Sequence, residues 1–343
     1  MICAREQNIQ PRPVVSSSAP KSTLPRAPRP ASKSEGSSAK KASQPARQTT
    51  RAGINGLRVR RLARSAEDGY RSNLVPGLKS SEDADRLALE LVFATQRLLA
   101  METAVTGLWA EVADATCDVE ERTWLAFLIA YIGPHETEAP FSVIESVRRT
   151  WASGERPRWH GVEAGPRGAY DEAGADATVD AYRAWAQRAG SQSRAFTGEP
   201  GWTAERRFDR IDERLALPGL TRDARFELLS LLGRCGVYEL RAGTLRLEGE
   251  NEVTWAAKRA FGIGDPLLLE HRAAALAVAC AVPLEALDLA LHNWGSGLRI
   301  GEGFDVESEP DPALLAQVTG ALGLPDRPHV LGPGPAEAPH RRQ

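Results

Sequence analysis

The chain has 343 residues, of which 42% are hydrophobic and 26% are charged, as is usual for a globular protein of one or two domains. Four cysteines, Cys3, Cys117, Cys235 and Cys280, lie far apart and form no C-x-x-C pair. This spacing excludes the usual zinc and iron–sulfur patterns and argues against a disulfide framework. We therefore expect a protein of a reducing compartment that carries no metal and no other cofactor.

The charge is distributed unevenly along the chain. Fourteen of the 43 Lys and Arg residues but only two of the 45 acidic residues fall within residues 1–65, so the formal charge is +12 there and −14 over residues 66–343. The first segment is rich in Ser, Pro and Ala, which predicts a disordered basic tail. Such a tail either solubilises the chain or binds DNA non-specifically, and we favour DNA binding.

The sequence contains no segment typical of secretion or of a membrane span. Its start lacks the apolar stretch of a secretory signal, and its most apolar run, residues 124–132, is about half as long as a membrane span. We therefore expect a cytoplasmic, nucleoid-associated protein without a membrane partner.

The body that follows is predicted to be mainly α-helical. Apolar residues at helical spacing predict helices over residues 80–113, 118–132, 141–151, 176–189 and 203–215. Asp118 and Glu121 resemble a capping box at the start of the second of these. Residues 152–175 are rich in Gly, Pro and charge and predict a long loop, which is either a lid or an insertion.

The second half of the body contains the most informative stretches. A helix is predicted over residues 222–232, a small strand over TLRLEG at 244–249, and three helices over 253–295 with breaks at 262–265 and 281–283. A short helix near residues 312–322 precedes an irregular end. We expect an all-α domain over residues 80–300 and a mostly irregular C-terminal tail over residues 301–343.

A tight turn, LPGL, separates the helix over 203–215 from the one that begins at Arg222. The pattern of hydrophobic residue, Pro218, Gly219 and Leu220 is typical of a helix-hairpin-helix. Proline presets one backbone angle and glycine allows an unusual one, so the turn exposes backbone N–H groups where the next helix begins, an end that suits a phosphate. Thr221 and Arg222 would add donors. An ordinary helix–helix turn is the alternative.

A second bend lies at Gly262 and Gly264, directly after the basic pair Lys258 and Arg259. Two glycines would let the backbone approach a phosphate closely. The alternative is a C-terminal glycine cap followed by a new helix with Asp265 as its N-cap and proline as its first residue. The basic pair favours phosphate contact.

The order of these elements resembles the helix-hairpin-helix DNA glycosylase superfamily over about residues 118–295. The stretches LPGLTRDARFELLSLLGRCGVYELR, AAKRAFGIGDPLLLEHRAAALA and LEALDLALHNW are similar to one group within it, the α-glutamyl/putrescinyl thymine pyrophosphorylase family. The resemblance implies a glycosylase-like helical domain that binds DNA. It also implies that an amine attacks a pyrophosphorylated 5-hydroxymethyl pyrimidine in DNA and expels pyrophosphate.

The catalytic residues of DNA glycosylases do not carry over. The lysine that some of them place after the hairpin falls on Asp223, and their essential aspartate falls on Thr254. Ordinary base excision is therefore not expected. Two alternatives to the transferase remain, which are a non-catalytic DNA-binding protein and a diverged glycosylase with a relocated carboxylate, such as Glu252.

The implied transfer needs cations at the leaving pyrophosphate and a proton acceptor for the amine. Lys258, Arg259 and Arg222 are the candidate cations. Asp223 and Asp265 are candidate acceptors, although a solvated helix residue and an N-cap, respectively, are the structural alternatives.

Three further residues have possible roles around the flipped base. His292 is another candidate acceptor, with the alternative that it only ends a helix. Trp255 and Trp294 are aromatic residues that could receive a base taken out of the stack. Their apolar helical spacing favours a place in the core instead.

Overall fold

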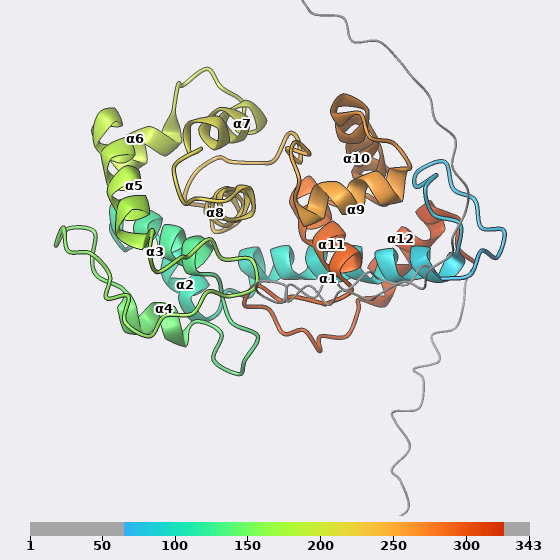
Figure 1. Ribbon diagram of the computed structural model, residues 1–343, viewed down its shortest axis with the longest axis horizontal. Coiled ribbons are helices and arrows are strands. Elements are labelled where there is room, and N and C mark those ends of the chain that lie inside the picture. Colours follow the sequence, from blue (N-terminus) through green and yellow to red (C-terminus); the bar gives the residue numbers. More distant parts are fainter. Residues whose placement is uncertain (1–64, 326–343) are drawn as a thin grey trace, which may run out of the picture. The chain divides into compact units, whose positions relative to one another are not determined.

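The computed structural model describes residues 65–325, and within them it contains helices and no β-strand (Figure 1). This confirms the all-α prediction for the described part. The predicted tail over residues 1–65 lies almost wholly outside it, as do residues 326–343. The helices are α1 (Ser81–Thr103), α2 (Gly107–Ala113), α3 (Val119–Ile132), α4 (Ser142–Val147), α5 (Ala175–Ala189), α6 (Gln192–Thr197), α7 (Ala204–Arg214), α8 (Arg222–Arg234), α9 (Glu252–Phe261), α10 (Pro266–Cys280), α11 (Leu284–Ser296) and α12 (Pro312–Leu322).

The helices pack as two groups that α1 joins. In the first group, α3 packs against α2, α4, α6 and α8, and α7 packs against α6 and α8. In the second group, α10 contacts α9, α11 and α12. Helix α1 contacts α8 on one side and α11 and α12 on the other, so it spans both groups (Figure 1).

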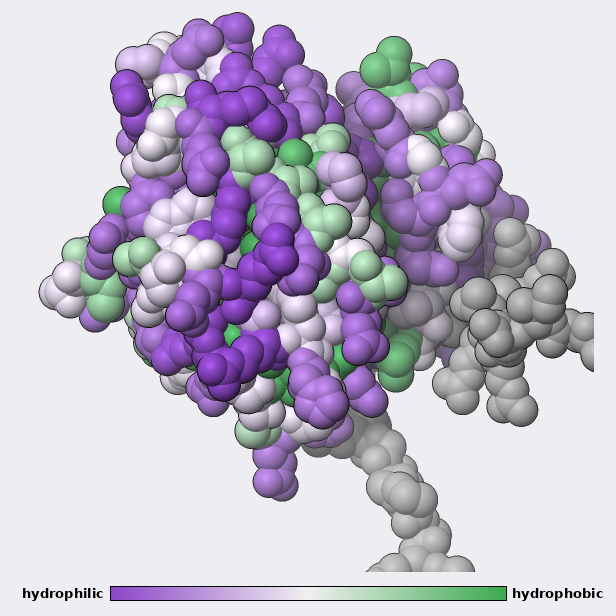
Figure 2. All heavy atoms as spheres, turned by 60° about the vertical axis from the view of Figure 1, so that its left-hand side comes forward, coloured by the Kyte–Doolittle hydropathy of each residue, from purple (hydrophilic) through white to green (hydrophobic). Residues whose placement is uncertain are grey.

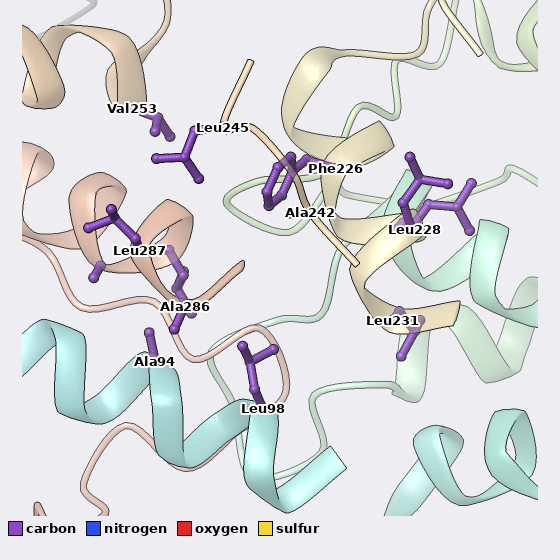
Figure 3. Packing of buried hydrophobic residues seen from close by; sticks show 14 of the residues in the cluster. Ala94, Leu98, Phe226, Leu228, Leu231, Ala242, Leu245, Val253, Ala286 and Leu287 are labelled. Atoms are coloured by element: carbon purple, nitrogen blue, oxygen red, sulfur yellow. The ribbon is translucent and has the colours of Figure 1, made fainter. Parts of the chain in front are cut away.

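Helix α11 lies at the centre of the second group. Every residue from Glu285 to Trp294 is buried, between α1, α9 and α10. One apolar core continues from one group into the other. It includes Leu287 of α11, Phe226 of α8 and Leu245 of the segment that follows α8 (Figure 3). A helix buried all round is normally apolar, so the polar residues of α11 need partners inside the protein.

The single helix predicted over residues 80–113 is wrong, because the chain breaks into α1 and α2. Gly107 has a φ of +56°, a left-handed conformation that disfavours any other residue. The ring of Phe141 lies where a side chain at this position would be, 3.1 Å from an added Cβ. The break therefore depends on a contact with a distant residue that the local pattern does not contain.

Several local predictions need smaller corrections. Asp118 does cap α3, but its carboxylate accepts from the amide of Glu120, and Glu121 instead accepts from the amides of Trp151 and Ala152 at 2.7 and 2.9 Å. The capping box is therefore absent. Helix α6 was not predicted, since its six residues are too few to show a periodicity.

The predicted strand over residues 244–249 is also wrong. The backbone amides of Leu245 and Leu247 do not pair with another strand. They donate to the two carboxylate oxygens of Glu270 on α10, at 2.7 and 2.6 Å. In contrast, the helices predicted over 222–232, 253–295 and 312–322 are confirmed, together with both breaks.

The predicted loop over residues 152–175 is packed against the end of α3. The carbonyl oxygen of Ile132, in the last turn of that helix, accepts from the amide of Gly165 at 2.8 Å. A Cβ added to Gly168 would lie 2.0 Å from the same oxygen. The loop thus supplies a partner to an unpaired carbonyl of a helix end.

Among residues 65–325 no single helix has the length and hydropathy of a membrane span. Only α10 and α11 taken together reach them, and that pair is bent by 106°.

Candidate functional site

The first predicted hairpin is a tight turn between α7 and α8. The amide of Leu220 donates to the carbonyl oxygen of Leu217 at 3.1 Å, and Gly219 has a φ of +75°. The Thr221 hydroxyl then caps α8 by accepting from the amide of Ala224 at 3.2 Å. Pro218 and Gly219 are exposed, so the turn presents its backbone at the surface.

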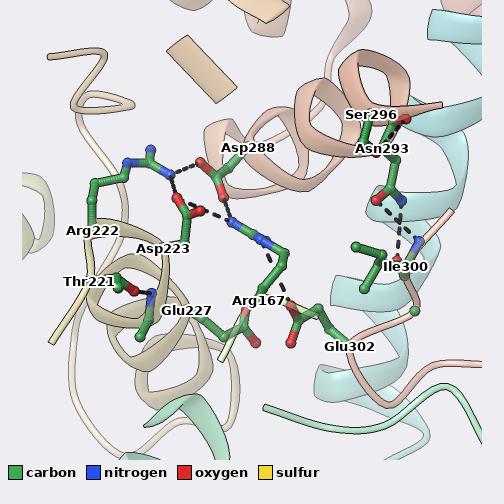
Figure 4. A network of polar contacts seen from close by, with 12 residues as sticks. Arg167, Thr221, Arg222, Asp223, Glu227, Asp288, Asn293, Ser296, Ile300 and Glu302 are labelled. Atoms are coloured by element: carbon green, nitrogen blue, oxygen red, sulfur yellow. Dashed lines mark hydrogen bonds and ion pairs between the residues drawn. The ribbon is translucent and has the colours of Figure 1, made fainter. Parts of the chain in front are cut away.

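The two residues that follow this turn extend into the protein. The Arg222 guanidinium pairs with Asp288 of α11 and, at 3.1 Å, with Asp223. It also donates to the carbonyl oxygen of Leu245. Arg222 therefore points into a charged cluster between α8 and α11 (Figure 4).

The deep end of this cluster comes from the loop before α5. Arg167 donates to Asp288 at 2.6 Å and lies 3.8 Å from Glu302, which follows α11. The side chains of Arg167 and Asp288 are both only 2% exposed, whereas those of Arg222 and Asp223 are 12% and 20% exposed. The cluster thus runs from the interior to the surface, and Asp223 lies at its outer end.

A second buried ion pair adjoins the first. Arg97 of α1 pairs with Glu227 of α8 and donates to the carbonyl oxygen of Glu302 at 3.4 Å. We use the name ionic cluster for Arg97, Arg167, Arg222, Asp223, Glu227, Asp288, His292 and Glu302. Within residues 65–325 no group of three or more His, Cys, Asp and Glu side chains could hold a metal ion. Each of the four carboxyl groups of the cluster pairs with one of its three arginines.

Burial and charge shift the pKa values in the ionic cluster in different directions. Burial alone would raise the pKa of Asp223, but the facing guanidiniums of Arg167 and Arg222 outweigh it and hold that pKa below its ordinary value. Burial, together with the charge of Arg167, lowers the pKa of His292 to about 4. For Glu302, burial and the nearby carboxylate of Glu227 raise the pKa to about 7.

His292 lies one helical turn after Asp288 on α11. Its side chain is buried, and its Nδ1 atom has no hydrogen-bond partner in the described part of the chain. With a pKa of about 4 the imidazole is neutral at pH 7. It is therefore an uncharged proton acceptor beside the carboxylates of Asp223 and Asp288, which both act on its pKa.

Only some of the predicted site residues belong to the ionic cluster. Asp223 and Arg222 do, but Arg259 pairs with Asp83 at 3.3 Å and lies over the ring of Trp294 at 4.4 Å. Lys258 is half-buried on α9, and it forms no hydrogen bond or ion pair through its side chain with residues 65–325. Neither of the two basic residues before the second bend forms a described ion pair with a member of the ionic cluster.

The second bend has the features of the capping alternative. Gly262, with a φ of +67°, ends α9, and Asp265 caps α10 by accepting from the amide of Leu268 at 3.0 Å. The backbone of Gly77 covers one side of the bend, since its amide donates to the carbonyl oxygen of Ala260 at 2.9 Å. Gly264 is exposed with no atom near it. Phosphate contact at this bend stays a prediction.

The two tryptophans have different environments. Trp294 is buried, and its indole nitrogen donates to the carbonyl oxygen of Asp83 at 2.9 Å, as expected for a core residue. Trp255 is 48% exposed, so the expectation that it lies in the core is wrong. Its neighbours Val253, Thr254 and Ala256 are the buried residues of that helix turn.

Five members of the ionic cluster were not predicted from the sequence: Arg97, Arg167, Glu227, Asp288 and Glu302. The run LEALDLALHNW did contain a signal, because Asp288 and His292 are spaced by four residues in an otherwise apolar helix and so share one face. Arg167 and Glu302 lie in segments without periodicity, and no pattern in the sequence points to them.

The segment after α8 links the two predicted hairpins. Leu245 accepts from Arg222 at the start of α8, and its amide donates to Glu270 in the second turn of α10. The beginnings of the two helices that follow the bends are therefore joined through one short stretch of chain. Comparisons with protein-family models, with curated proteins and with solved structures found no match for this chain.

Proposed function

We propose that this chain is a DNA-binding enzyme of base hypermodification with a helix-hairpin-helix, glycosylase-like arrangement, and that the ionic cluster is its active site. One observation carries the proposal. Arg222 and Asp223, the first two residues of the helix that follows the exposed LPGL turn, meet Asp288 of a buried helix in a cluster whose outer end, Asp223, is 20% exposed. A DNA strand held at the turn would thus lie beside ionisable groups.

The proposed reaction transfers an amine to a pyrophosphorylated 5-hydroxymethyl pyrimidine of DNA. The amine nitrogen forms a bond to the exocyclic methylene carbon while the bond from that carbon to the pyrophosphate oxygen breaks. The electron pair leaves with pyrophosphate, and the nitrogen gives up a proton. Nothing is oxidised or reduced in this step.

Asp223 and His292 are the proposed proton acceptors. The Asp223 carboxylate is ionised and reaches the surface, so it would also attract the cationic form of an amine donor. The imidazole of His292 is neutral at pH 7 and can accept a proton. The negative charge of a bound pyrophosphate would raise the pKa values of both groups toward neutrality, where general bases act best.

The three cations predicted from the sequence have different places in the structure. Arg222 lies in the ionic cluster at the start of α8, where a helix N-terminus also favours negative charge. Lys258 stays a candidate for the leaving group, because no acidic residue in the described part of the chain pairs with its amine. Arg259 and Asp265 have structural roles and are not part of the proposed site.

The test uses a DNA duplex that carries pyrophosphorylated 5-hydroxymethyluracil together with an amine donor. We expect the wild type to release pyrophosphate and to increase the mass of the modified nucleoside. Asp223→Asn should lower the rate by about 100-fold or more, as is typical when a positioned proton acceptor is lost. Asp265→Asn is the matched control, since asparagine also caps a helix well. No turnover by the wild type, or equal rates for both variants, would refute the assignment.

A second candidate function is DNA binding without catalysis. It is favoured by the balance within the ionic cluster, where the arginines and carboxylates already pair with one another. In that case the wild type would bind DNA but release no pyrophosphate, and no free base would be released from damaged DNA. The diverged glycosylase is less favoured, because its suggested carboxylate, Glu252, is exposed at the start of α9, outside the ionic cluster.

A further inference from the structure

A separate pocket lies where the C-terminal ends of α5 and α7 approach α6. Its volume is about 380 Å³, and its lining consists of Trp185, Arg188, Ala189, Ala195 and Arg214. None of these residues is acidic. Figure 2 brings the side of the molecule with α5 and α6 forward, and the surface there is mostly hydrophilic.

Two arginines line this pocket, and no acidic residue lines it. Arg188 and Arg214 are exposed, and neither forms an ion pair with another residue between 65 and 325. Arg194 lies over the end of α5, with its Nη1 atom 3.2 Å from the place that a Cβ of Gly190 would take. Arg188 and Arg214 line the same pocket, so their like charges repel one another. In a body whose formal charge is negative, such a group indicates a site for an anion.

The walls of the pocket are fixed by aromatic contacts. The Arg214 guanidinium lies over the ring of Trp202 at 5.0 Å, and the carbonyl oxygen of Trp202 accepts from Arg207 at 3.3 Å. Trp185 packs edge-on against Phe196 at 5.1 Å. A guanidinium whose plane is held by an aromatic ring presents its donors in a fixed fork, which matches the oxygens of a phosphate.

The pocket also continues the surface of the first turn. Arg214 is the last residue of α7, and Gly219 of the LPGL turn packs against Thr178 of α5. Thr178 and Arg188 are ten residues apart on the same helix, which is about 15 Å. This span corresponds to about four steps of a DNA duplex, at ~3.4 Å for each step.

We propose that the pocket of Arg188 and Arg214 binds a phosphate group, and that this phosphate belongs to the DNA strand held at the LPGL turn. The second part rests on the proposed function. A free phosphate compound would offer the same oxygens, so the test must distinguish the two sources.

The DNA arm measures binding of a labelled duplex by fluorescence anisotropy at several salt concentrations. Each phosphate contact contributes about 0.9 to the slope of log K against log salt. Because the pocket is proposed to hold one phosphate, Arg188→Gln/Arg214→Gln should lower the slope by about one, and Arg188→Gln alone should lower it by at most that amount. Arg156→Gln is the control, because Arg156 is an exposed arginine already paired with Asp176 and Asp180. Arg188→Gln removes no aromatic contact of the pocket walls, so it tests the site without disturbing the fold.

The second arm titrates inorganic pyrophosphate and follows tryptophan fluorescence. Suppose that the salt slope of DNA binding is the same in wild type and double variant, but that only the wild type binds pyrophosphate saturably. This result would support the pocket and assign it to a free phosphate compound. If the wild type binds pyrophosphate but no DNA, and the double variant loses the pyrophosphate binding, the pocket is supported and the proposed function is refuted. If the double variant has the same salt slope as the wild type and neither protein binds pyrophosphate, the proposed phosphate pocket is refuted. In that case DNA binding by the wild type would still support the proposed function.

Discussion

Arg167 and Asp288 form an ion pair that is closed to solvent, with 2.6 Å between guanidinium and carboxylate and 2% exposure on each side. The arginine comes from a loop, whereas the aspartate comes from the largely buried helix α11. Because a buried charge is costly without its partner, this contact fixes the loop of residues 152–175 to the place where α8 and α11 meet.

Replacing Arg167 should therefore destabilise the protein strongly. Arg167→Met leaves Asp288 with Arg222 as its remaining partner and removes a cation from Asp223 and Glu302. We expect the free energy of unfolding to fall by about 3–5 kcal/mol, measured by urea denaturation. Arg156→Met is the control, because it breaks exposed pairs with Asp176 and Asp180 and should cost less than about 1 kcal/mol. Equal losses in the two variants would mean that the ionic cluster contributes little to the fold.

His292 should make stability depend on pH on the acid side of neutrality. Its pKa is about 4 in the folded protein and about 6.5 in an unfolded chain. As the pH falls from 6.5 to 4, the unfolded chain takes up a proton that the folded protein does not. The free energy of unfolding should fall by on the order of 3 kcal/mol.

His292→Gln removes this proton uptake, and the measurement is the difference in unfolding free energy between wild type and variant at several pH values. We expect the wild type to lose stability relative to the variant from pH 6.5 downward and the difference to be constant above pH 7. A difference that does not change with pH would contradict the lowered pKa.

The local predictions succeeded where neighbouring residues decide the structure. The break between α9 and α10 follows from a left-handed glycine, Gly262, and from Asp265 as the cap of the next helix, and both signals lie within four residues. The turn at Gly219 is of the same kind. Three of the eight residues of the ionic cluster were accessible in this way, because Arg222 and Asp223 begin the helix after that turn and His292 stands out in a mostly apolar helix.

The remaining five residues of the ionic cluster depend on contacts between distant segments. Arg167 reaches Asp288 only because Gly165 and Gly168 lie against the end of α3 with no room for a side chain. Such close approach is a property of the packed chain and leaves no periodicity in a loop. Trp255 shows the reverse case, since a helical pattern gives the apolar face but does not reveal which tryptophan a neighbouring element will cover.

Glu302 should make stability depend on pH in the opposite direction to His292. Burial and Glu227 raise its pKa to about 7, above its ordinary value of about 4.3. The folded protein then holds a proton that the unfolded chain has lost, so the stabilisation is complete below about pH 4.3 and disappears as the pH rises through 7. In the wild type this dependence and that of His292 partly cancel.

Glu302→Gln isolates the contribution of this carboxyl group. The free energy of unfolding of the variant, relative to that of the wild type, should increase by on the order of 3 kcal/mol between pH 4.5 and pH 8. Urea denaturation at five pH values measures it. A relative stability that decreases with pH would show that the arginines of the cluster, and not burial, dominate the pKa of Glu302.

The LPGL turn gives the sharpest test of local geometry and of DNA contact together. Gly219→Ala places a side chain in a left-handed conformation, which costs about 1–2 kcal/mol, and its Cβ would lie 2.0 Å from Thr178 Oγ1. We expect a lower free energy of unfolding and weaker DNA binding, since the clash displaces the turn. Gly264→Ala is the matched control for stability in the second bend, where no atom lies within 4 Å of an added Cβ, and its stability should change little.

Adding Thr178→Ala to Gly219→Ala removes the closest clashing atom and should restore the part of the stability lost to the clash, but not the part lost to the left-handed backbone. If Gly219→Ala is as stable as Gly264→Ala and binds DNA as tightly as the wild type, the turn is neither strained in this way nor the point at which the protein holds DNA.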